Sequence, residues 1–277
     1  MNEKRFLDAN LALRAISIGA ELIEKRKTEN LISGIEESPR DIVTELDNKI
    51  EKRITEVLKT SGYRIIGEEM GKNKNLKIAG GKPVWLIDPI DGTMNLISSV
   101  PFYAVSVGLL IDSKFVVGAV AIPPQKEIFF TMGDRGSFLN GRALRKVQPV
   151  CLERSLIAVA FSGNNPNQLE RKQEYDLFGI INDKSRGCLR LGSATTNICY
   201  VAAGRLQAAY GIDSKIWDVA GALAVALQVG CHLYLGWQEG SIKLDYVVGA
   251  PEVTDEIANF FLEKKKTKLE IYETKSF

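Results

Sequence analysis

The 277-residue chain contains a single histidine, His232, and this scarcity excludes more chemistry than any other feature of its composition. A zinc site of the HExxH type needs two histidines and cannot be built from this sequence. A Ser-His-Asp triad would have to use His232, and no GxSxG motif accompanies it. The GxxxxGK[ST] phosphate loop and a GxGxxG motif after a strand are also missing. Any chemistry must therefore rest on carboxylates, hydroxyls and a metal ion.

Strong net charge, long apolar runs and paired cysteines are equally absent. The 36 basic and 34 acidic residues leave a net charge of +2, which predicts neither a nucleic-acid partner nor a membrane surface. No stretch approaches the about 18 apolar residues of a membrane span, and the N-terminal stretch has the pattern of an amphipathic helix, not of a signal peptide. The four cysteines show no CxxC spacing, which predicts reduced, mostly buried thiols in a cytoplasmic protein.

The hydrophobic pattern divides the chain into two halves, residues 1–149 and 150–277. The first half predicts a helix over residues 5–27, a second helix from Thr44, and then a run of antiparallel strands with tight turns at Asp112-Ser113 and Asn140-Gly141. In the second half strands alternate with helices, which are predicted over residues 168–182, 193–203, 217–229 and 252–262. This order predicts an α+β fold in which an antiparallel-sheet half packs against an α/β half.

The stretch WLIDPIDGTMNLI places two aspartates, Asp88 and Asp91, three residues apart at the end of an apolar run. Pro89 disfavours a helical conformation at Asp88, so we expect the strand to end there and the chain to turn. Gly92 permits unusual backbone angles, and N–H groups at the start of a helix from Thr93 would form an anion site. Two hard oxygen ligands beside a phosphate cradle suit magnesium-assisted phosphoryl transfer. The alternative is an Asp-Pro turn in which Asp91 merely caps the helix.

Three other acidic stretches have ordinary structural explanations when each is taken alone. Glu68 and Glu69 follow a predicted strand and could form a solvated turn. Asp47 fits a helix capping box with Thr44. Asp218 lies in the first turn of a long alanine-rich helix, where acidic residues are common.

Taken together, WLIDPIDGTMN, IIGEE, DIVTELD and WDVAGA resemble the inositol monophosphatase family of lithium-sensitive, magnesium-dependent phosphatases. The order and spacing of these stretches agree with the family over nearly the whole chain. The resemblance implies a layered αβαβα fold and an active site with two or three Mg²⁺ ions. It also leads us to expect a homodimer that acts on a small phosphorylated substrate, with no nucleic acid or membrane as partner.

The resemblance also assigns roles to individual residues. The expected ligands of the first magnesium are Glu68, Asp88 and the backbone carbonyl of Ile90. The expected ligands of the second are Asp88, Asp91 and Asp218. The expected catalytic group, which includes the pair that orients the attacking water, is Asp47, Thr93 and Glu68. The expected substrate contacts are Asp91, Gly92, Thr93, Gly192, Ser193 and Ala194.

The physical chemistry of clustered carboxylates agrees with these roles. Neighbouring carboxylates repel each other, and divalent cations neutralise that repulsion. Paired metal ions about 3.5–4 Å apart lower the pKa of a bound water and stabilise the leaving oxygen of a phosphate ester. Together with this chemistry, the resemblance implies hydrolysis of inositol monophosphate or a related sugar or polyol phosphate by metal-activated water.

Several departures from the family pattern concern the substrate. A lysine of many members falls on Glu36, an acid that contacts inositol falls on Gly211, and the EAGG segment begins here at Gln228. Glycine at 211 is expected to leave an open, permissive pocket. Fructose-1,6-bisphosphatase and 3'-phosphoadenosine 5'-phosphate phosphatase activities therefore stay open, as does a non-catalytic regulatory homologue. A phospho-aspartyl mechanism is disfavoured because it needs DxD spacing.

Overall fold

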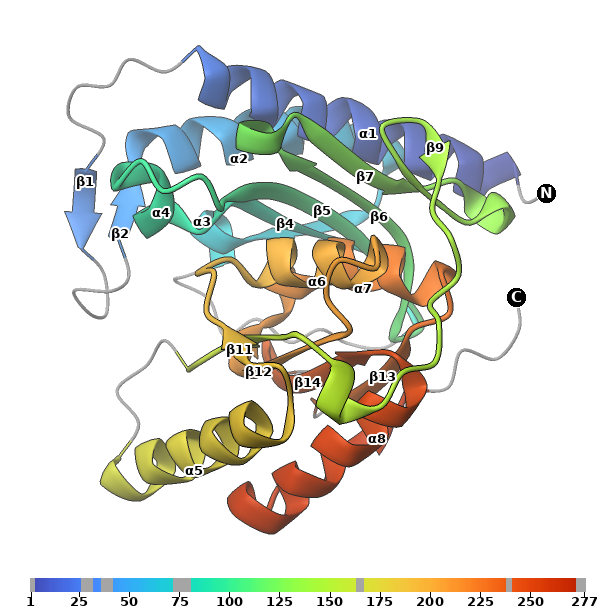
Figure 1. Cartoon of the computed structure of the whole chain (residues 1–277). Coiled ribbons are helices and arrows are strands. Elements are labelled where there is room, and N and C mark those ends of the chain that lie inside the picture. Colours follow the sequence, from blue (N-terminus) through green and yellow to red (C-terminus); the bar gives the residue numbers. More distant parts are fainter. Residues whose placement is uncertain are drawn as a thin grey trace.

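Helices and two sheets stack in five alternating layers, helix–sheet–helix–sheet–helix (Figure 1). This computed structural model describes residues 3–25, 32–35, 42–71, 81–162, 167–237 and 241–272. The layered α+β architecture confirms the predicted fold class. Among these residues, no helix combines the length and apolar character that crossing a membrane would need.

The outer layer on the N-terminal side is formed by α1 (Glu3–Glu24) and α2 (Glu45–Leu58), which cover one face of a seven-stranded sheet (Figure 1). The strands follow one another in sequence order, and only the first two run parallel. They are β3 (Arg64–Gly67), β4 (Val84–Asp91), β5 (Ala104–Ile111), β6 (Lys114–Ile122), β7 (Glu127–Thr131), β8 (Ser137–Leu139) and β9 (Arg142–Ala143). A separate ribbon pairs β1 (Ile32–Ile35) with β2 (Ile42–Thr44), and two short helices are α3 (Glu68–Gly71) and α4 (Thr93–Ile97).

The middle layer is formed by α6 (Ala194–Ala202) and α7 (Ile216–Gln228), which lie between the two sheets. The second sheet has the order β11-β10-β12-β14-β13-β15. Its strands are β10 (Ile157–Ala160), β11 (Cys188–Leu189), β12 (Ala208–Lys215), β13 (His232–Trp237), β14 (Lys243–Gly249) and β15 (Glu270–Ile271). The last layer is α5 (Gln168–Lys184) with α8 (Pro251–Phe260). Five further single turns are η1 (Lys59–Ser61), η2 (Pro123–Gln125), η3 (Gly133–Arg135), η4 (Leu152–Arg154) and η5 (Phe261–Lys265).

The central strands are apolar throughout because both faces of the first sheet are covered. On β4, Trp85 and Ile87 pack toward α1 and α2, whereas Val84 and Leu86 belong to the core around α6 and α7. Alternate residues of one strand therefore enter two different cores. Both predicted hairpin turns are present, and their central residues have the positive φ angles that two-residue hairpins favour.

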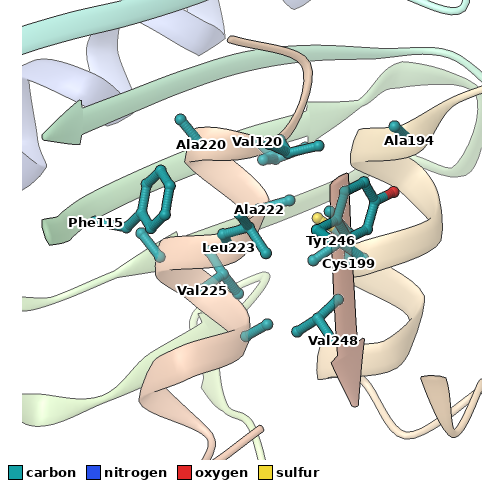
Figure 2. Packing of buried hydrophobic residues seen from close by; sticks show 14 of the residues in the cluster. Phe115, Val120, Ala194, Cys199, Ala220, Ala222, Leu223, Val225, Tyr246 and Val248 are labelled. Carbon is teal, nitrogen blue, oxygen red and sulfur yellow. The ribbon is translucent and has the colours of Figure 1, made fainter. Parts of the chain in front are cut away.

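Small residues let α7 lie almost directly on the first sheet, in the core that Figure 2 shows around Ala220 and Leu223. A Cβ atom added to Gly108 of β5 would lie 2.7 Å from Cβ of Ala220. One added to Gly118 of β6 would lie 2.9 Å from Cβ of Ala224 and would overlap a backbone carbonyl of the helix. This close packing fixes the start of α7 relative to the end of β4.

Two predicted strands differ from the structure, and a third strand was not predicted. The strand expected to end at Asp88 continues through Pro89 to Asp91, because the proline lies where the pairing with β5 is irregular. The strand predicted from Leu206 to Tyr210 is β12, which starts at Ala208 and extends to Lys215. The sequence reading missed β14, although its buried residues alternate at the start of the strand. The division of the chain at residue 149 stays a prediction; the two sheets span residues 64–143 and 157–271.

Candidate active site

A bulge in β4 brings Asp88 and Asp91 to the same face of the sheet. Residues three apart on a regular strand point to opposite faces. Asp88 pairs with Ser106 and Asp91 with Ala104, so β4 uses three steps where β5 uses two. The extra residue is a β-bulge, which reverses the alternation locally. Both carboxylates therefore face the layer of α6 and α7.

The DGTxN segment is tied to the start of α6 by direct hydrogen bonds. Asp91 Oδ2 accepts from Ser193 Oγ at 2.7 Å and from the backbone N–H of Thr195 at 2.6 Å. Asn95 Nδ2 donates to the carbonyl of Leu191 at 2.8 Å. These bonds join the motif of the first half to residues 191–195 of the second half.

Two glycines are required where these segments meet. Gly92 has φ +92°, and a Cβ there would lie 2.8 Å from the carbonyl oxygen of Phe102. Gly192 has φ +83°, and its Cβ would lie 2.8 Å from Asn95 Nδ2. Side chains at either position would meet both backbone strain and a close neighbour.

The predicted water-activating pair, Asp47 and Thr93, lies together although 46 residues separate the two in sequence. Asp47 is buried in the first turn of α2. Thr93 Oγ1 lies 3.4 Å from Asp47 Oδ1 and 2.9 Å from the carbonyl oxygen of Ile90. The hydroxyl thus lies between a carboxylate and the carbonyl that the sequence analysis assigns to a metal ion.

Asp88 lies at the electrostatic centre of the site. Its side chain is 2% exposed, and Oδ1 has no hydrogen-bond partner among the described residues. Burial raises its pKa well above the usual range for aspartate, and neighbouring negative charges raise it further. In order of effect, these charges belong to Glu68, Asp91, Asp218 and Asp47. The structure therefore gathers all five acids that the sequence analysis selected.

Asp218 and Glu68, whose charges both act on Asp88, share one neighbour, Lys215. Asp218 Oδ2 accepts the backbone N–H of Lys215 at 3.2 Å, which satisfies a donor at the start of α7. Lys215 Nζ lies 3.8 Å from Glu68 Oε1. A lysine ammonium therefore supplies positive charge beside a predicted metal ligand.

The donor set fits a hard divalent cation. Carboxylate and carbonyl oxygens are the ligands that Mg²⁺ prefers, and the unpartnered Oδ1 of buried Asp88 is an oxygen of this kind. Across the described part of the chain, no three acidic, histidine or cysteine side chains are already grouped as a ready metal site. Like charges repel, and Asp91 and Asp218 each accept hydrogen bonds from protein groups. A cation would compete with these donors for the two carboxylates.

A sequence profile of the Inositol monophosphatase family matches residues 3–265. The chain belongs to this family. Nus factor SuhB of Pseudomonas aeruginosa is 36% identical over 222 residues, which cover 78% of this chain and 81% of that protein. Inositol monophosphatase 2 of Solanum lycopersicum is 34% identical over 195 residues, with coverage of 69% and 73%. The structure of inositol monophosphatase II from Staphylococcus aureus is similar with a TM-score of 0.74, at 26% identity over 93% of this chain and 92% of that one.

Family membership confirms the predicted resemblance. Members of the inositol monophosphatase family are metal-dependent phosphatases that act on phosphate esters, and this chain is a member of that family. The individual roles of its site residues stay predictions.

One buried residue of this family member was not selected from the sequence. Glu51 of α2 accepts the N–H groups of Glu69 and Met70, at 2.8 and 2.7 Å. It thereby anchors α3, whose first residue is the predicted ligand Glu68. Gly67 makes room for it, since a Cβ there would lie 2.6 Å from Glu51 Oε1. The sequence carried one signal for Glu51. It lies four residues after the predicted site residue Asp47, and residues four apart share one face of a helix.

The predicted substrate segment is largely enclosed. Ser193 is buried, lies beside Asp91 and accepts the N–H of Thr196 at 3.1 Å as the cap of α6. Ala194 is also buried, two residues after Gly192, which has a left-handed backbone conformation. Glu36 lies outside the described residues, as does the side chain of Thr44, so nothing tests the readings made at those two positions.

The open space expected beside Gly211 is not present. The ring of Tyr246 lies across this glycine, and an added Cβ would lie 2.8 Å from Cζ of the tyrosine and 2.7 Å from Ser214 Oγ. The expectation was wrong because the sequence does not reveal which residues pair with Gly211; on β14 its partner is Tyr246.

Proposed function

We propose that this chain is a magnesium-dependent phosphomonoesterase that hydrolyses small polyol, sugar or nucleotide phosphates with metal-activated water. The observation that carries the proposal is the environment of Asp88, a buried carboxylate ringed by four other acids and with an unpartnered oxygen among the described residues. Burying a carboxylate without a compensating charge is costly. A site that keeps five acids together is therefore suited to a bound cation.

The residues that would hold Mg²⁺ are Glu68, Asp88, Asp91, Asp218 and the carbonyl of Ile90. When bound, the ions supply charge neutralisation, a water of lowered pKa and stabilisation of the leaving oxygen. Because Asp88 is proposed as a ligand of both ions, we expect its loss to be the most damaging.

Asp47 and Thr93 would position the attacking water. Thr93 Oγ1 carries one proton, which it can donate to Asp47 or to the carbonyl of Ile90. The hydroxyl oxygen can then accept a hydrogen bond from water, which orients a lone pair toward phosphorus. Asp47 is placed to take up the proton that the water loses.

The phosphate and the alcohol part of the ester would lie on two segments. The N–H groups of Gly92 and Thr93 are proposed to bind phosphate oxygens, and the positive φ of Gly92 fixes their direction. Gly192, Ser193 and Ala194 are proposed to border the alcohol part. The hydrogen bond from Asn95 to Leu191 supports this arrangement because it holds the two segments together.

The substrate class is proposed from related structures. SaIMPase-II has been solved with inositol monophosphate bound and with 2'AMP bound, and this chain is 26% and 27% identical to those structures. We therefore propose that polyol and nucleotide monophosphates are both candidates. A cytoplasmic location, a homodimer and inhibition by lithium are further parts of the proposal that follow from the family resemblance.

A regulatory role is the second candidate function, because the relative that is 36% identical is a Nus factor. Such a role needs no catalysis. The complete set of acids around Asp88 supports the enzymatic proposal instead, since a purely regulatory surface gives no reason to keep mutually repelling carboxylates buried.

The proposal is tested by phosphate release from a panel of esters. The panel is inositol 1-phosphate, glycerol 2-phosphate, 2'-AMP, fructose 1,6-bisphosphate and 3'-phosphoadenosine 5'-phosphate. We expect hydrolysis of at least one ester with Mg²⁺, and its loss with EDTA and in Asp88→Asn. Asp176→Asn is the matched control, because Asp176 is exposed on α5 and pairs with Lys172. Folded protein that hydrolyses none of the esters, or hydrolyses them equally well with EDTA, would refute the proposal.

A further inference from the structure

Tyr246 of β14 is a buried residue without an assigned role. Its side chain is 0% exposed, and its hydroxyl has no hydrogen-bond partner among the described residues. A buried hydroxyl that makes no hydrogen bond is destabilising, because it has lost its bonds to water. We therefore expect this hydroxyl to form a hydrogen bond in another state of the site, when a ligand binds or when nearby side chains rearrange.

The ring of Tyr246 is directed toward the candidate active site. Gly211 is its cross-strand neighbour, and the lack of a side chain there lets the ring lie across β12. Figure 2 shows the ring next to α6, with its oxygen on the side of Ala194, at the start of that helix. This is the same turn of α6 that donates hydrogen bonds to Asp91 from Ser193 and Thr195.

The hydroxyl lies within electrostatic reach of two predicted metal ligands. Burial raises the pKa of Tyr246, and the negative charges of Asp91 and then Asp218 raise it further. The side chain is therefore a neutral group that can donate one hydrogen bond toward acidic oxygens. A neutral hydrogen-bond donor beside a metal-binding carboxylate can orient that carboxylate without adding a second positive charge that would compete with the metal ion.

We propose that Tyr246 is a positioning residue of the metal site, whose hydroxyl donates a hydrogen bond to Asp91 when that carboxylate turns to bind a cation. The inference rests on the proposed metal-dependent function. Cation binding would draw Asp91 away from some of its present donors at the start of α6, and Tyr246 would supply a replacement. Gly211 is then required for the same interaction, because the lack of a side chain there makes room for the ring of Tyr246.

Tyr210 provides a matched control on the opposite face of the same sheet. It is also 0% exposed and its hydroxyl also has no partner in the described structure. Its ring packs edge-on against Phe261 in the core below the second sheet, and none of the five site acids is among the charges that act on it. Tyr210→Phe and Tyr246→Phe therefore remove the same atom from equally buried sites, and only one of them faces Asp91.

The test compares Mg²⁺ affinity by isothermal titration calorimetry without substrate, with Mn²⁺ binding by electron paramagnetic resonance as a second readout. We expect Tyr246→Phe to raise the Kd by about tenfold or more, and Tyr210→Phe to leave it unchanged. Without metal, both variants should unfold at the wild-type temperature or above, because each loses an unpaired hydroxyl. Gly211→Ala, which keeps the hydroxyl but displaces the ring, should also raise the Kd.

The outcomes separate this inference from the proposed function. A wild-type Kd in Tyr246→Phe, or an equal loss in Tyr210→Phe, would overturn the role of Tyr246 and leave the proposed function standing. Absence of Mg²⁺ binding by the wild-type protein would overturn both.

Discussion

Replacing Glu51 with glutamine tests whether one buried carboxylate fixes the backbone around the predicted ligand Glu68. The carboxylate accepts two N–H groups, from Glu69 at 2.8 Å and from Met70 at 2.7 Å. Glutamine keeps one acceptor oxygen, whereas its NH₂ group would face a second N–H donor. A hydrogen bond to a charged group contributes about 1.5–3 kcal/mol, so we expect a loss of about 2–4 kcal/mol including the unpaired donor.

The assay is urea unfolding followed by tryptophan fluorescence, in EDTA and in Mg²⁺. Glu56→Gln is the matched control on the same helix, because the Glu56 side chain is 46% exposed and pairs with Arg53 at 2.8 Å. An exposed pair of this kind contributes at most about 1 kcal/mol, so the control should stay close to wild type. Mg²⁺ should also protect the Glu51 variant less than wild type, since Glu68 directly precedes the released backbone.

Equal stability losses in the two variants would refute this reasoning. So would a loss below about 0.5 kcal/mol in Glu51→Gln, because that is the range of ordinary surface substitutions. Full protection of the Glu51 variant by Mg²⁺ would show instead that the anchoring of α3 does not affect Glu68.

The remaining predictions concern charge, catalysis, space and thiol reactivity. Asp88→Asn should stabilise the metal-free protein in urea unfolding at pH 7. The folded-state pKa of Asp88 is raised, so the wild-type protein should gain stability as the pH falls, and the variant should gain less. Thr93→Ala should lower kcat by about 10²-fold or more with a smaller change in KM, measured on the best ester. Gly211→Glu should lower the thermal unfolding temperature and bring no gain for inositol 1-phosphate, because Tyr246 fills the space. Burial raises the pKa of Cys231 to about 12, so a thiol reagent at pH 8 should label Cys231 slowly until denaturant is added.

The sequence sufficed for the layered fold and for the membership of the acidic cluster. Asp47, Glu68, Asp88, Asp91 and Asp218 each lie close to an end of a strand or helix whose apolar pattern is clear. Each acid alone has an ordinary structural explanation, and the resemblance of their motifs to one family is what predicted that they form a common site. In the structure the charges of the other four acids raise the pKa of Asp88, which agrees with that choice.

The sequence did not suffice for contacts that depend on strand register. The pairing of Gly211 with Tyr246 is set by how β12 and β14 align, and 35 positions separate them without any local signal of that alignment. Glu51 was missed for a different reason. Its partners are backbone N–H groups of another segment, which leave no trace in residue type, so its position four residues after Asp47 was the one signal that the sequence offered.

The bulge in β4 makes the length of the DPxD motif matter as much as its residues. Insertion of one residue between Asp88 and Asp91 would leave a single bulge unable to bring both side chains to one face, and would turn the second carboxylate toward the core beneath α1 and α2. A single in-frame codon gain would then do more damage than most substitutions there, since it misplaces a charge and removes a bond to Ser193 at once. Loss of one residue has a different effect, because two carboxylates two positions apart share one face of a regular strand without any bulge.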